Sequence, residues 1–295
     1  MILPNQAIAA ADVAAHYDDL DAFYREIWGE HLHHGLWING DEPPEVAVEK
    51  LAEKVIAAAG IQVNALVCDV GCGYGASARL LAERLNARVT AVTLSRAQYE
   101  WGRRRPTDNG RVHYLNVDWM NNSLPNGYFD AAIAIESTEH MPSIEGCFEE
   151  MFRVLKPGGR VAIVAWLSAE SPSPWQVRHL LEPICREGRL ALMGTETDFH
   201  RLLEKAGFKD IEFEELTAKV KRTWSICIGR FLSRLVRRAD YQRQCFSRAF
   251  KNRIFALTLF RIWLAYACGA MRYGVFSASR NSASNGWSMR CVSAA

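Results

Sequence analysis

The residues best suited to chemistry form a short acidic and histidine-bearing segment near the middle of the chain. Glu136, Glu139 and His140 directly follow the apolar run at 133–135. Histidine has an ordinary pKa of about 6.5, so it can take a proton at neutral pH. Carboxylates beside it can orient the imidazole or offset positive charge on a substrate. We therefore predict His140 as a base, Glu136 as its orienter or a cation stabiliser, and Glu139 as a third member. The alternative is that Glu139 and His140 merely begin the next helix, where acidic side chains favour the N-terminus.

A glycine-rich segment follows another apolar run. Residues 69–75 read Asp-Val-Gly-Cys-Gly-Tyr-Gly. Glycine adopts backbone conformations that other residues resist, so a ligand can approach the main chain closely. The helix expected after it offers free N–H groups and a partial positive charge to an anionic group such as a carboxylate. The segment predicts a cofactor loop, and a turn that only packs is the alternative.

Two classes of cofactor fit this loop. It satisfies the dinucleotide pattern G-x-G-x-x-A, which would end at Ala76. Dinucleotide sites usually carry an acid about 20 residues later, at the end of the second strand, where it holds the ribose. Here residues 92–95 read Val-Thr-Leu-Ser, and the acids instead are Asp69, before the glycines, and Asp118, after the third apolar run. An NAD(P)-dependent oxidoreductase is therefore the weaker interpretation.

Alternating strands and helices must position these segments. Apolar runs predict five strands, at 65–70, 88–93, 112–117, 129–135 and 160–166. Helices are expected at 76–85 and 145–155, the second stopped by Lys-Pro-Gly-Gly at 156–159. This alternation implies right-handed crossovers and a parallel sheet covered on both faces, which is a doubly wound α/β fold. Ligands bind at the carboxyl ends of strands in such sheets, so both segments should face one cleft.

The rest of the chain predicts additions to this core. Gly207 is expected to end a helix before a sixth strand at 211–216. Helical spacing then predicts cap helices before a final strand near 273–276, with an aperiodic Ser/Asn-rich tail from Ser277. The apolar stretch 254–271 is interrupted by Arg261 and is too short for a bilayer span, so a packed helix is expected. The expected organisation is an N-terminal helical lid (1–45), an α/β core (46–166), a helical substrate cap (167–205), a sixth-strand region (206–217), a basic helical cap insertion (218–272), a final core strand (273–281) and a disordered tail (282–295).

Together these motifs resemble the class I S-adenosylmethionine (SAM) methyltransferases, which have a Rossmann-like sheet. The resemblance covers about residues 45–217 and the final strand, and it rests on the glycine loop, Asp118 and Lys-Pro-Gly-Gly. More narrowly, several segments are similar to the tocopherol C-methyltransferase group and its relatives among natural-product N- and C-methyltransferases: Tyr17-Asp18 with 27–35, Thr93-Leu94-Ser95 with Gln98, and 136–141. In that group Thr-Leu-Ser stands where other class I enzymes place the ribose acid.

The resemblance implies transfer of a methyl group from SAM to a small, largely apolar natural product. An aromatic or isoprenoid carbon is the favoured acceptor, and the nitrogen of an alkaloid-type amine is the alternative. The glycines are implied to approach the amino-acid part of SAM, Asp69 to position their loop, and Asp118 with Trp119 to flank the adenine. For Trp119, ordinary core packing is an equal alternative. The implied cofactor-binding residues are Asp69, Gly71, Cys72, Gly73, Gly75, Thr93, Leu94, Gln98, Asp118, Trp119 and Glu136.

The N-terminal segment is rich in histidine and aromatic residues. Residues 16–37 hold four histidines among two tyrosines, two tryptophans and a phenylalanine. Cysteines and carboxylates at metal-ligand spacing are lacking, so no metal is expected. We predict an aromatic lid over the cofactor, with Tyr17 and His34 on the substrate or cofactor side. A helix pair that only packs its aromatic side chains on the core is the alternative.

Charge is unevenly distributed along the chain. The net charge is +2, but residues 221–295 carry +13 and residues 1–220 carry −11. The acidic larger part argues against a nucleic-acid binder. Arginines such as Arg230, Arg234 and Arg237 alternate with apolar residues, which suggests contact with an anionic membrane surface or an anionic substrate such as a prenyl diphosphate. A solvated helix face paired with the acidic core domain is the alternative. Eight cysteines without CxxC pairs and the absence of a secretory leader predict a cytoplasmic protein, peripheral to the membrane if that contact forms. An oligomer is left open.

Overall fold

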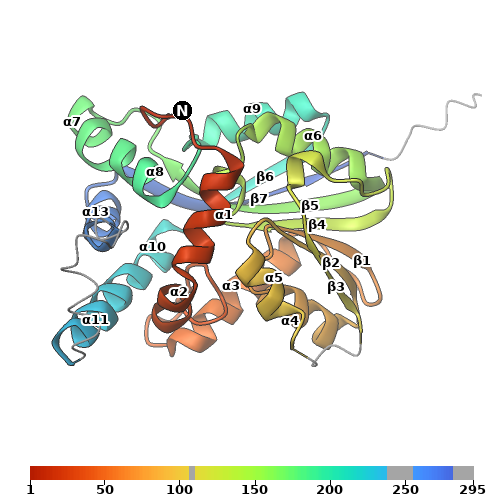
Figure 1. The fold of residues 1–295 in the computed structure, drawn as a ribbon. Helices are drawn as coiled ribbons and strands as arrows, with labels where there is room; N and C mark the ends of the chain where they lie inside the picture. The colour runs from red at the N-terminus through yellow and green to blue at the C-terminus, as the bar shows by residue number, and fades with distance from the viewer. Residues whose placement is uncertain (106–109, 238–254, 282–295) are drawn as a thin grey trace, which may run out of the picture.

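A seven-stranded sheet forms the centre of the molecule (Figure 1). The computed structural model describes residues 1–105, 110–237 and 255–281. The strand order is β3-β2-β1-β4-β5-β7-β6. The strands are β1 (Leu66–Val70), β2 (Arg88–Thr93), β3 (Val112–Asn116), β4 (Phe129–Ile135), β5 (Leu155–Ser168), β6 (Lys209–Glu215) and β7 (Met271–Ser279). The predicted doubly wound α/β fold is confirmed.

The parallel arrangement expected for the first five strands is confirmed, and the last strand runs against it. β7 lies between β5 and β6 and pairs antiparallel with both, whereas β1 to β5 pair in parallel. The cause lies in the connection after β6. Helices α10 (Thr217–Val220), α11 (Arg222–Arg237) and α13 (Phe255–Ala267) stay at the end of the sheet where β6 finishes, so the last strand runs back from that end.

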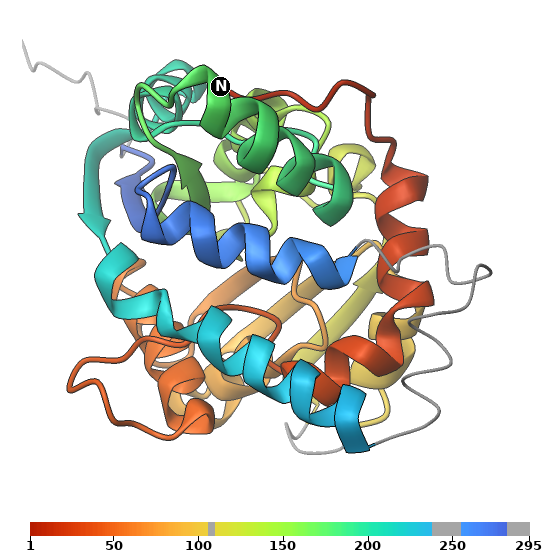
Figure 2. The ribbon, with the colours of Figure 1, turned by 90° about the vertical axis from the view of Figure 1, so that its left-hand side faces the viewer.

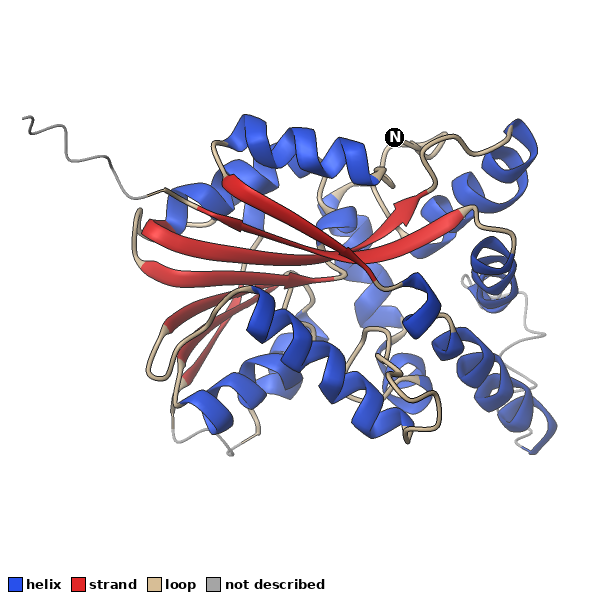
Figure 3. Cartoon of the chain, turned by 180° about the vertical axis from the view of Figure 1, so that it is seen from behind, coloured by secondary structure: helices blue, strands red, loops and turns tan. Residues whose placement is uncertain are grey.

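Helices cover both faces of the sheet (Figure 3). On one face α6 (Ile144–Val154) and α9 (Glu196–Ala206) bury Phe148 and Phe199. On the other face α3 (Pro44–Ala58) and α4 (Ala76–Leu85) bury Leu51 and Leu81. Each such side chain stabilises the fold by roughly 1.5–3 kcal/mol. α5 (Arg96–Gly102) follows β2. The central strands can therefore hold side chains rigidly at their carboxyl ends.

The remaining helices gather at the carboxyl ends of the parallel strands. They are α1 (Ala10–Asp19), α2 (Asp21–Ile27), α7 (Pro174–Gln176), a π-helical turn (Val177–Leu181), α8 (Glu182–Gly188), α10, α11 and α13. Figure 2 shows α11 and α13 side by side, with α1 and α2 at their flank. The N-terminal and C-terminal segments therefore build one cap together. Among the described residues, no helix is long and apolar enough to span a bilayer.

Two predicted boundaries differ from the structure. Residues 156–159 do not form a loop before β5, because Leu155 already pairs with Phe129 and the segment bulges within the strand before Arg160 pairs with Ala131. Backbone hydrogen bonds with residue 280 hold this bulge in the sheet. β7 likewise continues to Ser279, so the aperiodic tail does not begin at Ser277. The predicted tail at 282–295 and residues 238–254 of the basic insertion lie outside the described residues.

Candidate active site

The glycine loop forms a tight turn between β1 and α4. The amides of Gly71 and Cys72 both donate to the carbonyl of Val92, which draws the loop toward the end of β2. Gly71 has φ +76°, and a Cβ there would lie 2.3 Å from Cβ of Ser137. Only glycine fits such a position. Gly75 differs from the expectation: it precedes α4 and packs against the ring of Tyr114, and it does not line the cavity that the loop borders.

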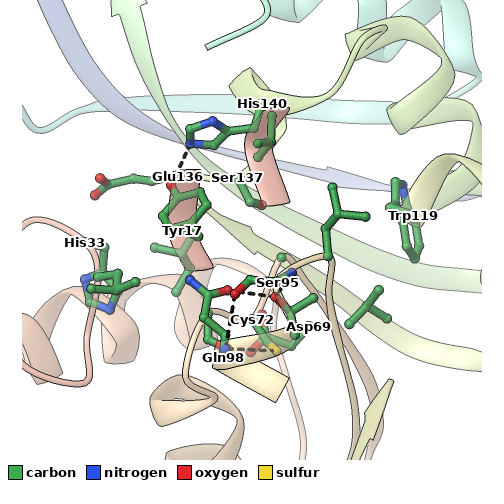
Figure 4. Close-up of a pocket in the computed structure, with 18 of the residues that line it drawn as sticks. Tyr17, His33, Asp69, Cys72, Ser95, Gln98, Trp119, Glu136, Ser137 and His140 are labelled. Atoms are coloured by element: carbon green, nitrogen blue, oxygen red, sulfur yellow. Dashed lines mark hydrogen bonds between the residues drawn. The ribbon is translucent and has the colours of Figure 1, made fainter. Parts of the chain in front are cut away.

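The cofactor cavity lies at the carboxyl ends of β1, β2, β3 and β4 (Figure 4). It encloses about 920 Å³ including its mouth, and residues 13–17 and 30–33 of the cap complete it. Apart from Gly75, the residues expected on the cofactor side all contribute to its lining: Asp69, Gly71, Cys72, Gly73, Thr93, Leu94, Gln98, Asp118, Trp119 and Glu136. One cavity thus brings together side chains that follow four different strands.

Asp69 gives a direct indication of what this cavity accepts. Its carboxyl is buried, and Oδ2 has no hydrogen-bond partner among the described residues. Burial raises the pKa of Asp69 to about 7. The resemblance implies that Asp69 positions the loop, but Oδ2 accepts no hydrogen bond from the loop. A buried acceptor oxygen at a cavity fits a ligand that brings its own N–H donor, such as the ammonium of SAM.

Asp118 and Trp119 have structural contacts as well as places in the cavity. The Asp118 carboxylate caps a short turn by accepting from the Met120 amide at 3.0 Å. Trp119 is buried, and its indole N–H donates to the carbonyl of Cys147 at 3.4 Å. Trp119 therefore both packs in the core and presents a wall to the cavity, so the two interpretations of this residue are compatible.

The cap is fastened over the cofactor cavity by acidic side chains. Asp18 of α1 accepts hydrogen bonds from the Ser95 hydroxyl at 2.5 Å and the Ala97 amide at 3.0 Å, at the start of α5. Glu30 forms an ion pair with Arg79 of α4. These contacts join the N-terminal segment to the cofactor loop and to the helix that follows β2. The cap is therefore held against the elements around the cofactor cavity.

His140 and Tyr17 form a hydrogen-bonded pair in the site. Nδ1 of His140 lies 2.9 Å from the carbonyl oxygen of Arg189, which can only accept, so Nδ1 carries the proton. Nε2 then accepts from the Tyr17 hydroxyl at 2.9 Å. Burial lowers the pKa of His140 and raises the pKa of the Tyr17 phenol. The pair therefore consists of a neutral imidazole whose lone pair faces a protonated phenol.

Glu136 does not orient His140, contrary to the expectation. Its carboxylate accepts from the backbone and Nδ1 of His34 at 2.7 and 2.9 Å, from the Trp166 indole at 2.6 Å and from the Tyr273 hydroxyl. Burial acts to raise the pKa of Glu136, but the contacts with His34 and Tyr273 hold it below its ordinary value. The carbonyl of Arg189 takes the orienting role instead. Glu136 is a fixed negative charge in the site, which leaves the prediction of a cation stabiliser open.

His34 links Glu136 to the C-terminal helices. The Trp224 indole N–H donates to Nε2 of His34 at 2.7 Å, so Nε2 must be unprotonated and Nδ1 carries the proton toward Glu136. The cap histidine is therefore neutral with a fixed tautomer. Trp166, Trp224 and Tyr273 were missed from the sequence. Trp166 ends one predicted strand and Tyr273 begins another, which was a usable signal, whereas Trp224 lies in the predicted insertion.

Glu139 is held in a separate set of contacts. Its carboxyl accepts from the Trp166 amide and from the Thr138 hydroxyl. Burial raises its pKa to about 7 despite these hydrogen bonds. Residues Thr138–His140 form an isolated helical turn, and α6 begins only at Ile144, where the Ser143 hydroxyl accepts from the Gly146 amide. The alternative that Glu139 and His140 merely begin the next helix is therefore wrong.

A second chamber adjoins the cofactor cavity and encloses about 640 Å³ including its mouth. Tyr17, Leu32, Glu136 and His140 line both spaces. The second chamber is mostly aromatic and aliphatic, and among the described residues no Lys or Arg lines it. Its other lining residues are Tyr24, Trp28, His34, Glu139, Trp166, Ile184, Gly188, Leu190, Trp224, Thr258 and Ile262. Among the described residues there is also no cluster of three His, Cys, Asp or Glu that could hold a metal.

The arginines of α11 contact the cap. Arg230 donates to the carbonyl of Ile27, and Arg234 donates to the carbonyl of Glu26, both at 2.6 Å. These carbonyls end α2, where a cation is favourable. Arg234 and Arg230 therefore stabilise the wall of the second chamber. This contact differs from the membrane and anionic-substrate alternatives raised for these two side chains, and the ion pair of Arg234 with Glu26 agrees with the alternative of a helix face paired with the acidic part of the chain.

Comparisons with known proteins agree with this geometry. The family model described as a methyltransferase domain matches residues 68–163. The chain is 31% identical to a probable tocopherol O-methyltransferase, chloroplastic, of Oryza sativa, over 73% of this chain and 64% of that protein. It is 30% identical to the tocopherol O-methyltransferase, chloroplastic, of Arabidopsis thaliana, over 76% of this chain and 73% of that protein.

A solved structure shares the fold at lower sequence identity. The mycolic acid cyclopropane synthase CmaA1, solved in complex with SAH, superposes with a TM-score of 0.81 at 17% identity, over 93% of this chain and 99% of that one. The family membership sets aside the oxidoreductase alternative and identifies SAM as the cofactor that the cavity accepts. The chain belongs to the class I SAM-dependent methyltransferases.

Proposed function

We propose that this enzyme methylates a small, largely apolar acceptor of the natural-product kind, held in the second chamber. The observation that carries the proposal is the Tyr17–His140 pair, because both side chains line the cofactor cavity and the second chamber. An acceptor there would lie beside a base and beside the cofactor. The sequence resemblance favours a carbon acceptor, with an amine nitrogen as the alternative.

The chain's own residues position the acceptor and handle its proton. When bound, SAM supplies an electrophilic methyl group. The aromatic wall excludes water and orients the acceptor. A proton that leaves the acceptor passes to the Tyr17 oxygen as the Tyr17 proton moves to Nε2 of His140. The carbonyl of Arg189 then holds the imidazolium through Nδ1–H, and the negative charge of Glu136 favours the protonated form of His140.

The remaining expectations concern partners. Contact with an anionic lipid surface stays a proposal for the outer face of α11, where Leu232, Val236 and Arg237 are exposed. A prenyl diphosphate is a poor match for the second chamber, since no Lys or Arg among the described residues lines it. The helical segments from both ends of the chain would act together as the substrate cap.

A screen with labelled SAM tests the proposed function. Candidate acceptors are tocopherol precursors, indole alkaloids, other tertiary amines and prenyl diphosphates, and NMR of the product locates the new methyl group. His140→Ala should bind SAH nearly as the wild type does and should lose about 100-fold or more in turnover, the scale of a lost acid–base group. Unchanged turnover in His140→Ala would remove the proposed role of the pair.

A further inference from the structure

Five described aromatic side chains form a continuous wall around the second chamber. Ring centroids are separated by 5.3 Å between Tyr17 and Tyr24, 5.6 Å between Tyr24 and Trp28, 5.9 Å between Trp28 and Trp224, and 5.5 Å between Trp224 and Trp166. The rings come from α1, α2 and its end, α11 and the end of β5. Segments far apart in the sequence thus converge on one aromatic enclosure.

The charges on the described lining residues of the chamber have a single sign. The Glu136 carboxylate is ionised and Glu139 lies beside it, whereas no Lys or Arg among the described lining residues supplies positive charge. His34 is neutral because Nε2 accepts from Trp224. His140 is neutral because burial lowers its pKa. The chamber therefore favours a positively charged group over an anion.

Aromatic rings favour cations for a related reason. The face of an aromatic ring carries partial negative charge, and several rings around one site form the enclosure that binds quaternary ammonium groups. A wall required only to bury an uncharged hydrocarbon could be built from Leu and Ile at equal apolar area. Aromatic faces combined with a fixed carboxylate provide electrostatic attraction that aliphatic side chains do not.

We propose that the acceptor is an amine, and that the chamber stabilises the positive charge that its nitrogen gains on methylation. This inference rests on the proposed function and specifies the substrate class of the same site. The nitrogen lone pair forms the new N–C bond while the C–S bond breaks. The electron pair of the C–S bond stays on sulfur. The product nitrogen gains the positive charge.

The degree of substitution of the amine decides what happens to its proton. A tertiary amine gives a quaternary product and releases no proton. A secondary amine gives a product that can release one proton through Tyr17 to His140. An amine that arrives protonated must lose its proton to the same pair before it can attack. The Tyr17–His140 pair and the aromatic enclosure therefore have complementary roles in one reaction.

Three isosteric probes test the charge preference. Choline, 3,3-dimethylbutan-1-ol and 3,3-dimethylbutanoate share a branched head of similar size, and choline carries the positive charge there. Each is titrated into the full chain saturated with SAH, with calorimetry and tryptophan fluorescence as readouts. Choline should bind about tenfold or more tightly than the alcohol, and the anion should bind most weakly. Equal affinity for choline and the alcohol would overturn the inference.

Substitutions at Trp28 locate the effect. Its ring contacts Tyr24 and Trp224. Trp28→Leu should reduce choline affinity to that of the alcohol, and Trp28→Phe should keep most of the preference. Trp175→Leu is the matched control, since Trp175 is 55% exposed on α7 and does not line the chamber. If the preference survives Trp28→Leu, or if Trp175→Leu abolishes it, the inference fails.

The same titrations separate two kinds of failure. If SAH does not bind, the proposed function itself is wrong. If SAH binds and choline shows no preference over the alcohol, only the amine inference is wrong, and the carbon acceptor favoured by the sequence is the remaining candidate. If the anion binds best, a diphosphate-like acceptor replaces the amine.

Discussion

Removal of the Tyr17 hydroxyl tests the role of the Tyr17–His140 hydrogen bond, which lies between the two cavities, by deleting a single oxygen atom. Tyr17→Phe keeps the ring and its stacking on Tyr24 at 5.3 Å. It removes the donor that lies 2.9 Å from Nε2 of His140. The buried lone pair of Nε2 then has no donor from residue 17. An unsatisfied buried acceptor costs about 1–3 kcal/mol, and we expect the free energy of unfolding to fall by that amount.

The catalytic effect of Tyr17→Phe should exceed its effect on cofactor binding. Loss of a group that relays a proton typically lowers turnover by about 100-fold or more. SAH should still bind at near wild-type affinity, because the ring that lines the cavity remains. Calorimetry with SAH, urea unfolding and single-turnover methyl transfer measure the three quantities separately. The acceptor is the one identified with labelled SAM.

Tyr24→Phe supplies the matched control. The Tyr24 hydroxyl also lies 2.9 Å from Nε2 of a buried histidine, His16. Unlike Tyr17, however, Tyr24 lines only the second chamber. Tyr24→Phe keeps the ring in the chamber wall, so it should lose similar stability and far less turnover than Tyr17→Phe. Wild-type turnover in Tyr17→Phe, or an equal loss of turnover in both variants, would refute the role of the Tyr17–His140 pair.

The remaining predictions concern pH, the glycine loop and the cap. Burial raises the pKa of Glu139 from 4.5 to about 7, so the folded state keeps a proton that the unfolded state releases, and wild-type stability should fall as pH rises through that window by up to about 3 kcal/mol. Glu139→Gln should reduce this slope in urea unfolding at pH 4.5–8 and leave the part contributed by buried Asp69, whose pKa is also raised to about 7; an unchanged slope would show that Glu139 does not contribute. Gly71→Ala should weaken SAH binding about tenfold or more in calorimetry because its Cβ would lie 2.3 Å from Ser137, whereas Gly29→Ala, with φ +90° and open space, should keep SAH affinity while costing about 1 kcal/mol of stability. Equal SAH affinities in the two glycine variants would contradict the proposed approach of the loop to the cofactor. Arg234→Glu should raise KM for the acceptor by releasing the end of α2, and Arg237→Glu should leave KM unchanged and lower co-sedimentation with anionic vesicles; the reverse pattern would contradict both assignments.

The elements of the core could be predicted because their signals are local. Each strand from β1 to β4 is a short apolar run between turn residues, and α4 matches its predicted bounds at 76–85. The glycine loop is equally local, since its shape depends on residue types within one turn. Pairing between segments far apart in the sequence could not be predicted from local patterns. Lys-Pro-Gly-Gly extends β5 only because residue 280 pairs with it across the sheet.

The sequence could predict which residues belong to the candidate site, but it could not predict which of them contact one another. Glu136 and His140 are neighbours in sequence, yet Glu136 pairs with His34 and His140 pairs with Tyr17. Both partners lie more than 100 positions away in the N-terminal cap. Glu136 has φ +53°, which is unusual for a residue other than glycine and accompanies this departure from the local pattern. Long-range packing decided the contacts, and periodicity carries no information about it.

A crystal structure of the full chain with sinefungin and a tertiary amine would test the central claim most directly. Sinefungin carries an amine in place of the transferred methyl group. We predict that this amine points at Tyr17 and His140. The acceptor nitrogen should lie within the aromatic enclosure, which includes Tyr24, Trp28, Trp166 and Trp224. A cofactor analogue lodged elsewhere, or one whose amine faces away from Tyr17 and His140, would contradict the account.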